Sequence, residues 1–461
     1  MPAALKRSLC ALCCCALLCL YTACSGLEGT VKEEPNTASP AAGNIPAADK
    51  PAASGIEIDP SAQSGDYDYN TINGDDAPQQ GYYTPISLTH GFDALQTQPQ
   101  QYFYKRLTSD VYTVAQQPNE GGNYLIEKIH LPGMYLKEEE IRLVIEAFSS
   151  DHPEVFWLDN LFGYTFDGTD MVIQMYSIIS PETIDIYTDE INAVADSMIA
   201  SVPKGLDEYE RERFIHDNLL ARCTYATDTK NIQQNWKPFT VYGALAEGSA
   251  VCEGYTKAIQ YLLRFVGIES IPVNGTAKEQ WHQWNLVKID GCWYHLDATW
   301  NDSTDYIFYD YFNITDTIIQ YDHRIASDFF ALDPDDICGS VGKEAQLFNI
   351  TLPSCTETAA NFYIHEAVIL YGFDEKASAA VENKMLQTAL EKKQELYIQI
   401  SNSIAYNEAV EGLFYQAPYQ FFTYIDHTNS LLGGEYAISK ENVRIIKKER
   451  LRIVEIRLEY I

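Results

Sequence analysis

The feature that most constrains the fold is a β-hairpin between residues 281 and 297, whose register can be counted residue by residue. Asp290-Gly291 separates two runs rich in β-branched and aromatic residues, and this pair favours the type I′ turn of a two-residue hairpin. If the residues that flank the turn pair with each other, His282 and Asp297 lie on one face as diagonal neighbours. Their backbones are then about 7–8 Å apart, within side-chain reach. The sequence therefore predicts an antiparallel sheet that brings an imidazole to a carboxylate.

His295 is a second histidine on the same hairpin and a rival for the same role. The register places it opposite Leu286, on the face that carries His282. Asp297 is two residues away on its own strand, and no other acid is evidently placed to orient it. We therefore interpret His282 as the histidine that exchanges protons, with Asp297 fixing its tautomer. The tryptophans around the hairpin are expected to form core and cleft wall: Trp281, Trp284, Trp293 and Trp300.

Cys252 lies at the predicted start of a helix. Apolar residues recur at helical spacing from Tyr255 to Val266, and Gly267 is a typical residue after a helix C-terminus. In the first turn, unpaired backbone N–H groups and the helix dipole favour a thiolate. A cysteine there is either a nucleophile or a buried structural thiol, and the histidine and carboxylate of the hairpin favour the nucleophile. Outside the N-terminal segment an odd number of cysteines remains, so at least one is unpaired: Cys223, Cys252, Cys292, Cys338 and Cys355.

Three segments in this order resemble the bacterial transglutaminase-like superfamily: Val251 to Tyr255, His282 to Asn285, and Trp293 to Trp300. The likeness is clearest from about residue 210 to 325 and includes His216-Asp217 and His323. It implies a papain-like α+β core, in which a helix bearing Cys252 packs on an antiparallel sheet bearing His282 and Asp297. The superfamily is similar across transglutaminases, proteases, deamidases and members with no known activity, so the resemblance does not choose a reaction.

The N-terminus predicts export. Lys6-Arg7 precedes an apolar run from Leu9 to Leu20, which has the length of a secretory signal and is too short to span a bilayer. The run ends in Tyr21-Thr22-Ala23-Cys24, which resembles the lipobox of bacterial lipoproteins. We therefore expect residues 1–23 to be a signal peptide and Cys24 to carry a lipid that holds the protein outside the cytoplasm at the bacterial cell membrane. Cleavage without lipidation, giving a secreted protein, is the alternative.

The rest of the chain divides by composition and periodicity. Residues 24–84 are rich in small and polar residues, which predicts a flexible spacer. Mixed helical and strand patterns predict small α+β domains at 85–204 and 346–461, flanking a transglutaminase-like catalytic domain at 205–345. Helices are expected at 137–148, 183–199 and 375–393, strands at 171–176 and 361–370, and a terminal hairpin at 443–461.

Charge and the absence of motifs exclude several functions. A net charge of −33 makes nucleic acid an unsuitable partner, because phosphate binding requires a basic patch. Phosphate-binding loops, a Gly-x-Ser-x-Gly elbow and a His-Glu-x-x-His helix do not occur, so neither a cofactor nor a metal is expected. Basic residues near the C-terminus are expected to form a solvated strand face, with contact to anionic lipid or wall polymer as the alternative: Lys440, Arg444, Lys447, Lys448, Arg450, Arg452 and Arg457.

Together these features predict an extracytoplasmic cysteine acyl-transfer enzyme that acts on peptide or carboxamide bonds through a thioester. Cys252 is the expected nucleophile, His282 the base and acid, and Asp297 the orienting residue; the backbone N–H of Cys252 is expected to donate to the oxyanion. Hydrolysis of a protein or peptide, cell-wall peptide included, is preferred over crosslinking, because water is abundant outside the cell. The alternative is a non-catalytic module that binds peptide or cell wall in an aromatic cleft.

Overall fold

The computed structural model describes residues 83–227, 235–278, 280–302, 307–326, 330–331, 346–347, 351–434 and 436–461. The predicted signal peptide and nearly all of the spacer lie outside these residues, as do Cys24 and Cys338. The described residues form two compact units: those of the first lie within Met1–Ala200, Thr227–Trp236 and Ser327–Phe348, and those of the second within Ser201–Ala226, Lys237–Ala326 and Asn349–Ile461. None of the helices in the described ranges combines the length and hydropathy of a membrane-spanning segment.

The first unit is built on a five-stranded antiparallel sheet. Its central strand, β5, pairs with β2, β3 and β4, and its side chains alternate between buried and partly exposed, as in a sheet covered on one face. The helices and strand predicted at 137–148, 183–199 and 171–176 are confirmed. The elements are α5 His90–Asp93, α6 Gln98–Asp110, β1 Val114–Pro118, β2 Tyr124–Ile126, β3 Ile129–Leu131, α7 Glu138–Asp151, β4 Leu158–Phe166, β5 Met171–Ser177 and α8 Pro181–Ser201, with the short pair β12 Phe330–Ala331 and β13 Gln346–Leu347.

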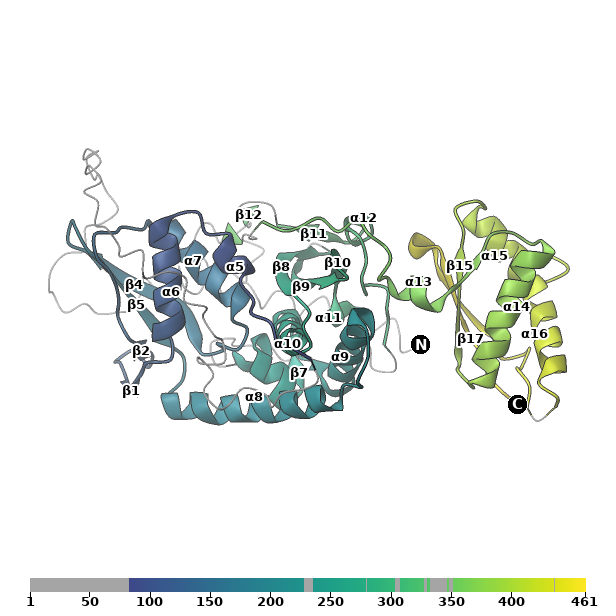
Figure 1. The fold of residues 1–461 in the computed structure, drawn as a ribbon, viewed down its shortest axis with the longest axis horizontal. Coiled ribbons are helices and arrows are strands. Elements are labelled where there is room, and N and C mark those ends of the chain that lie inside the picture. Colours follow the sequence, from purple (N-terminus) through teal and green to yellow (C-terminus); the bar gives the residue numbers. More distant parts are fainter. Residues whose placement is uncertain are drawn as a thin grey trace. The chain divides into compact units, whose positions relative to one another are not determined.

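The second unit begins with the core that carries Cys252. A four-stranded antiparallel sheet in the order β10-β9-β8-β11 packs against helix α10 (Figure 1). The α+β class and the helix on an antiparallel sheet are therefore confirmed. The elements are α9 Glu208–Arg222, β6 Thr224–Tyr225, η3 Lys237–Phe239, η4 Gly243–Glu247, β7 Ser249–Ala250, α10 Cys252–Phe265, β8 Ser270–Ala277, β9 Gln280–Ile289, β10 Cys292–Leu296, α11 Ala298–Asn301, α12 Asp316–Ile319 and β11 His323–Ile325.

Helix α10 is buried on nearly every side. All of its residues except Lys257 are buried, because α9, α11 and the short helices η3 and η4 pack around it on the sides that the sheet leaves uncovered. Gly254 permits the closest of these contacts: a Cβ there would lie 2.4 Å from the backbone oxygen of Pro238. The first turn of α10 is therefore held directly against the segment before it, which fixes the position of Cys252.

The predicted hairpin is confirmed in both turn and register. Strands β9 and β10 pair from Ile289 opposite Cys292 to Asn285 opposite Leu296. Asp290 and Gly291 have φ angles of 49° and 80°, the two positive values that a type I′ turn requires. The side-chain parity predicted for His282, His295 and Asp297 therefore holds in the structure.

The C-terminal part of the second unit has its own sheet, in the order β14-β15-β17-β16, with β14 and β15 parallel. The helix predicted at 375–393 and the terminal hairpin are confirmed. The strand predicted at 361–370 is wrong over its first half, because the Asn361 side chain accepts from the N–H of Tyr363 and starts a helix instead. The elements are α13 Phe362–Glu366, β14 Val368–Leu370, α14 Glu375–Leu390, β15 Glu395–Ile400, α15 Tyr406–Phe414, α16 Gln420–Leu431, β16 Arg444–Lys448, η6 Glu449–Leu451 and β17 Ile453–Arg457.

Candidate active site

The hairpin brings His282 and Asp297 into direct contact. The Nε2 atom of His282, on β9, lies 2.6 Å from Oδ2 of Asp297, which follows the end of β10. Both side chains are buried, with 4% of His282 and none of Asp297 exposed. A hydrogen bond this short in a buried site fixes both the tautomer and the orientation of the imidazole ring.

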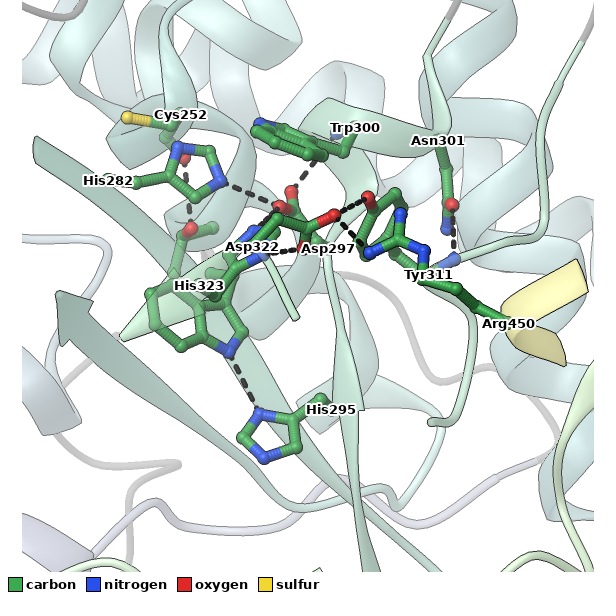
Figure 2. Close-up of polar contacts among 12 residues, drawn as sticks. Cys252, His282, His295, Asp297, Trp300, Asn301, Tyr311, Asp322, His323 and Arg450 are labelled. Carbon is green, nitrogen blue, oxygen red and sulfur yellow. Dashed lines mark hydrogen bonds and ion pairs between the residues drawn. The ribbon is translucent and has the colours of Figure 1, made fainter. Parts of the chain in front are cut away.

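Cys252 completes the group from the other side of the ring. It is the first residue of α10, and its side chain is fully buried. In Figure 2 the imidazole of His282 lies between the Cys252 thiol and the Asp297 carboxylate. Because Nε2 is engaged by Asp297, Nδ1 is the atom of His282 that can exchange a proton with Cys252.

The helix N-terminus does not by itself make Cys252 a thiolate, contrary to the expectation from sequence. Burial raises the pKa of the Cys252 thiol well above its ordinary value, and this outweighs the lowering by the backbone N–H groups of Gln283 and Glu253. The negative charges of Glu253 and Asp297 raise it further. A thiolate at Cys252 therefore requires transfer of its proton to His282, which leaves a neutralising ion pair in place of an isolated charge.

Asp297 accepts more hydrogen bonds than orienting His282 requires. Its Oδ1 accepts from the N–H of Trp300 and caps α11, while its Oδ2 also lies 3.0 Å from Nε2 of His323. Burial alone would raise the pKa of the Asp297 carboxyl group. The positive charges and hydrogen bonds of His282 and His323 reverse that effect and hold the pKa well below its usual range.

Sequence reasoning did not identify His323 as a site residue, although the segment lies within the family resemblance. Strand β11 pairs with β8 so that His323 is opposite Ala277, and Gly275, two residues away on β8, is opposite His282. The two histidines therefore share one face of the sheet, with ring centroids 5.4 Å apart. The available signal was the Asp322-His323 pair at the start of a short strand, which periodicity alone cannot connect to Asp297.

His295 has a structural environment of its own. Its Nδ1 accepts from the indole N–H of Trp284 at 2.9 Å, and its Nε2 lies 2.8 Å from Oδ1 of Asp316. The expectation that no acid orients His295 is therefore wrong. Because an indole nitrogen only donates, the proton of His295 must reside on Nε2 and point at Asp316. A proton on Nδ1 as well would point at the indole N–H of Trp284, so that two donors would face each other. Burial also lowers the pKa of His295, which disfavours the charged ring.

The same hydrogen bonds decide whether a metal suits these residues. Among the residues that the structure describes, two groups offer ligand atoms within 4.8 Å of one another: His282 with Asp297 and His323, and His295 with Asp316 and Cys355. In each group a protonated ring nitrogen faces a carboxylate oxygen at hydrogen-bond distance. At His295 the other nitrogen accepts from Trp284, so a metal on Nε2 would require an imidazolate. The donor sets therefore suit proton sharing better than metal ligation.

Comparison with known proteins places this core in a family. Residues 193–298, which include Cys252, His282 and Asp297, match the model of the Transglutaminase-like superfamily. A human protein named Kyphoscoliosis peptidase is 23% identical over 154 residues, which cover 30% of this chain and 23% of the human protein.

Two solved structures are also similar in part. One is a crystal structure of a TGase, with 17% identity over 39% of this chain and 52% of that chain, and a TM-score of 0.22. The other, from Cytophaga hutchinsonii, is proposed to be a cysteine protease; it has 12% identity over 41% of this chain and 69% of that chain, and a TM-score of 0.20. Scores this low establish no common fold over the whole chain, and the assignment rests on the family match. The resemblance inferred from three sequence segments is confirmed, and this chain carries a domain of the Transglutaminase-like superfamily.

Proposed function

We propose that the chain is a cysteine-dependent enzyme that cleaves peptide or carboxamide bonds through a thioester at Cys252. The observation that carries the proposal is the buried arrangement in which His282, held at 2.6 Å by Asp297, lies beside the Cys252 thiol. This is the geometry in which one imidazole takes a proton from a nucleophile and later delivers it to a leaving group. A protein or peptide, cell-wall peptide included, is the proposed substrate.

The steps follow from the contacts. The Cys252 thiol gives its proton to Nδ1 of His282, and the thiolate attacks the carbonyl carbon of the substrate. As the first residue of α10, Cys252 has a backbone N–H without an intrahelical partner, and this group can donate to the oxyanion. His282 then protonates the leaving amine, the carbon–nitrogen bond breaks and a thioester remains. A water molecule, deprotonated by His282, releases the acid and restores the thiol.

Hydrolysis is proposed over crosslinking for two reasons. Water is available to resolve the thioester in an extracytoplasmic setting, whereas crosslinking needs a bound amine. The name of the human relative, a peptidase, also favours hydrolysis, although this chain spans under a quarter of that protein. Formation of an amide between a peptide glutamine and an added primary amine, at the expense of hydrolysis, would reverse this choice.

A non-catalytic binding module is the second candidate, and the complete burial of the Cys252 thiol favours it. Cysteine labelling separates the two. Cys292 is the most exposed of the described cysteines, whereas Cys223, Cys252 and Cys355 are buried. If exposure governs reactivity, iodoacetamide modifies Cys292 first. If His282 activates Cys252, modification of Cys252 at neutral pH is at least about tenfold faster than that of Cys292 and falls to the slow rate in His282→Ala. Peptide mass spectrometry measures both rates.

We also propose that Cys24 anchors the protein by a lipid outside the cytoplasm, on the grounds of the signal-like N-terminus. The variant Cys24→Ala is expected to move from the membrane fraction to the soluble fraction when the full chain is expressed in a bacterial host. Its rate of Cys252 modification should be unchanged, because the anchor takes no part in the chemistry. Retention of Cys24→Ala in washed membranes would exclude Cys24 as the attachment point.

A further inference from the structure

His323 is held between two carboxylates. Its Nε2 lies 3.0 Å from Asp297 and its Nδ1 lies 2.8 Å from Oδ1 of Asp322. Carboxylate oxygens only accept hydrogen bonds when ionised, whereas a neutral imidazole offers one donor and one acceptor. Burial alone would raise the pKa of both Asp297 and Asp322, but the hydrogen bonds and charges of their neighbours outweigh it and lower both pKa values, so both groups are ionised at neutral pH. The buried His323 ring therefore has an acceptor facing each of its nitrogens, an arrangement that an imidazole with a proton on both nitrogens satisfies.

Asp322 connects this ring to the C-terminal hairpin. Its Oδ2 accepts from the hydroxyl of Tyr311 and from Nη1 of Arg450, each at 2.8 Å. Arg450 belongs to η6, the short turn between β16 and β17. Arg450, Asp322, His323, Asp297 and His282 thus form one unbroken series of ion pairs and hydrogen bonds (Figure 2).

We propose that His323, held as an imidazolium between Asp297 and Asp322, is a positioning residue for the reaction at Cys252, and that Arg450 of the C-terminal hairpin stabilises it through Asp322. This inference rests on the proposed function. His323 and His282 donate to the same oxygen of Asp297, so His323 limits where that oxygen can lie relative to the His282 ring. The C-terminal hairpin thereby becomes part of the support of the active site, although it supplies no group that touches substrate.

The charge of His323 gives the inference a measurable consequence. Asp297 and Asp322 each carry one negative charge, and His323 and Arg450 each carry one positive charge, so the four groups sum to zero. Loss of the charge on His323 leaves a net negative charge beside His282, which favours retention of protons by the Cys252–His282 pair. With the rings 5.4 Å apart, Coulomb's law with an effective protein dielectric constant of about 20 predicts an upward shift of the pair's apparent pKa values by about two pH units.

The test uses the full chain and follows Cys252 modification by iodoacetamide as a function of pH. His323→Gln is the primary variant, because its amide can still donate to Asp297 but carries no charge. The pH midpoint of modification is expected to rise by about two units, while circular dichroism remains that of the wild type. Loss of the charge on His323 moves the pH midpoint of Cys252 modification. A merely structural role of His323 would slow the modification and leave the midpoint unchanged.

Arg450 is tested with a matched control. Arg450→Ala is expected to raise the midpoint by a smaller amount than His323→Gln, and Arg450→Lys to restore it in part, because lysine keeps the charge but not the fork of donors. Arg444→Ala removes the same charge from an exposed position on β16 and should leave the midpoint unchanged. Equal midpoints in Arg450→Ala and Arg444→Ala would remove Arg450 from the proposal.

A second measurement is independent of Cys252. Nuclear magnetic resonance of protein labelled with ¹⁵N-histidine should show an imidazole with both nitrogens protonated at neutral pH whose signals disappear in His323→Gln. A neutral His323 would overturn the inference. If Cys252 reacts fast in the wild type and the midpoint does not move in His323→Gln, the inference fails and the proposed function stands. If wild-type Cys252 reacts no faster than Cys292, the proposed function fails, and the resonance result still decides the charge of His323.

Discussion

Cys252→Ala and His282→Ala are each expected to reduce kcat by about a thousandfold or more, and the double variant to be no slower than either alone. Thiol and imidazole act as a unit, since neither can transfer the proton without the other. The Cys252 thiol depends on His282 especially strongly, because burial raises its pKa and no other route to a thiolate is evident in its surroundings. The measurement is kcat on whichever peptide or carboxamide the wild-type chain cleaves.

His295→Ala provides the contrast. It leaves the indole N–H of Trp284 and the Asp316 carboxylate without this partner, so a lower Tm is expected. Its kcat per folded molecule should change only modestly, because His295 faces Asp316 and not Asp297. An inactive His295→Ala variant beside an active His282→Ala variant would show that His295, and not His282, transfers the proton. Full turnover by Cys252→Ala would exclude a mechanism through a thioester at Cys252.

The parts of the site that could be predicted from sequence depend on local rules. A two-residue Asp-Gly turn fixes the register of its hairpin, and the register fixes which side chains share a face, so His282 and Asp297 could be paired by counting. Apolar periodicity and a terminal glycine likewise located α10 and placed Cys252 in its first turn. In both cases the information lies within about 20 residues of the feature.

The parts that could not be predicted depend on contacts between distant segments. His323 lies 26 residues from Asp297, and Arg450 lies 128 residues from Asp322. The basic residues near the C-terminus were expected to be a solvated strand face, but Lys448 is buried against Asp310 and Glu455. The pKa of Cys252 has the same origin: helix position predicts a lowered value, and the packing that buries the thiol raises it. The local sequence does not contain these contacts between distant segments or the burial that they cause.

Asp297→Ala is expected to lose both activity and stability, because one carboxylate serves three donors. The variant leaves His282, His323 and the N–H of Trp300 without this acceptor in a fully buried site. Removal of one member of such a buried charge network costs about 3–5 kcal/mol. We therefore expect the Asp297→Ala variant to stay folded at room temperature with a clearly lower Tm. Its kcat should be higher than that of Cys252→Ala, since Asp297 transfers no proton itself.

Asp297→Asn is the matched variant and should be milder on both measures. An amide oxygen can still accept from the histidines, while the amide nitrogen replaces the oxygen that caps α11 at Trp300.

The pH dependence of Tm distinguishes loss of the charge from loss of packing. The folded-state pKa of Asp297 is held below that of an unfolded aspartate, about 3.9. Its contribution to stability is therefore complete above about pH 5 and declines as the pH falls through the unfolded and then the folded pKa. The difference in Tm between wild type and Asp297→Ala should accordingly be constant near neutrality and shrink in acid. A difference that stays constant down to pH 3 would show that the lost stability comes from the cavity and not from the carboxylate.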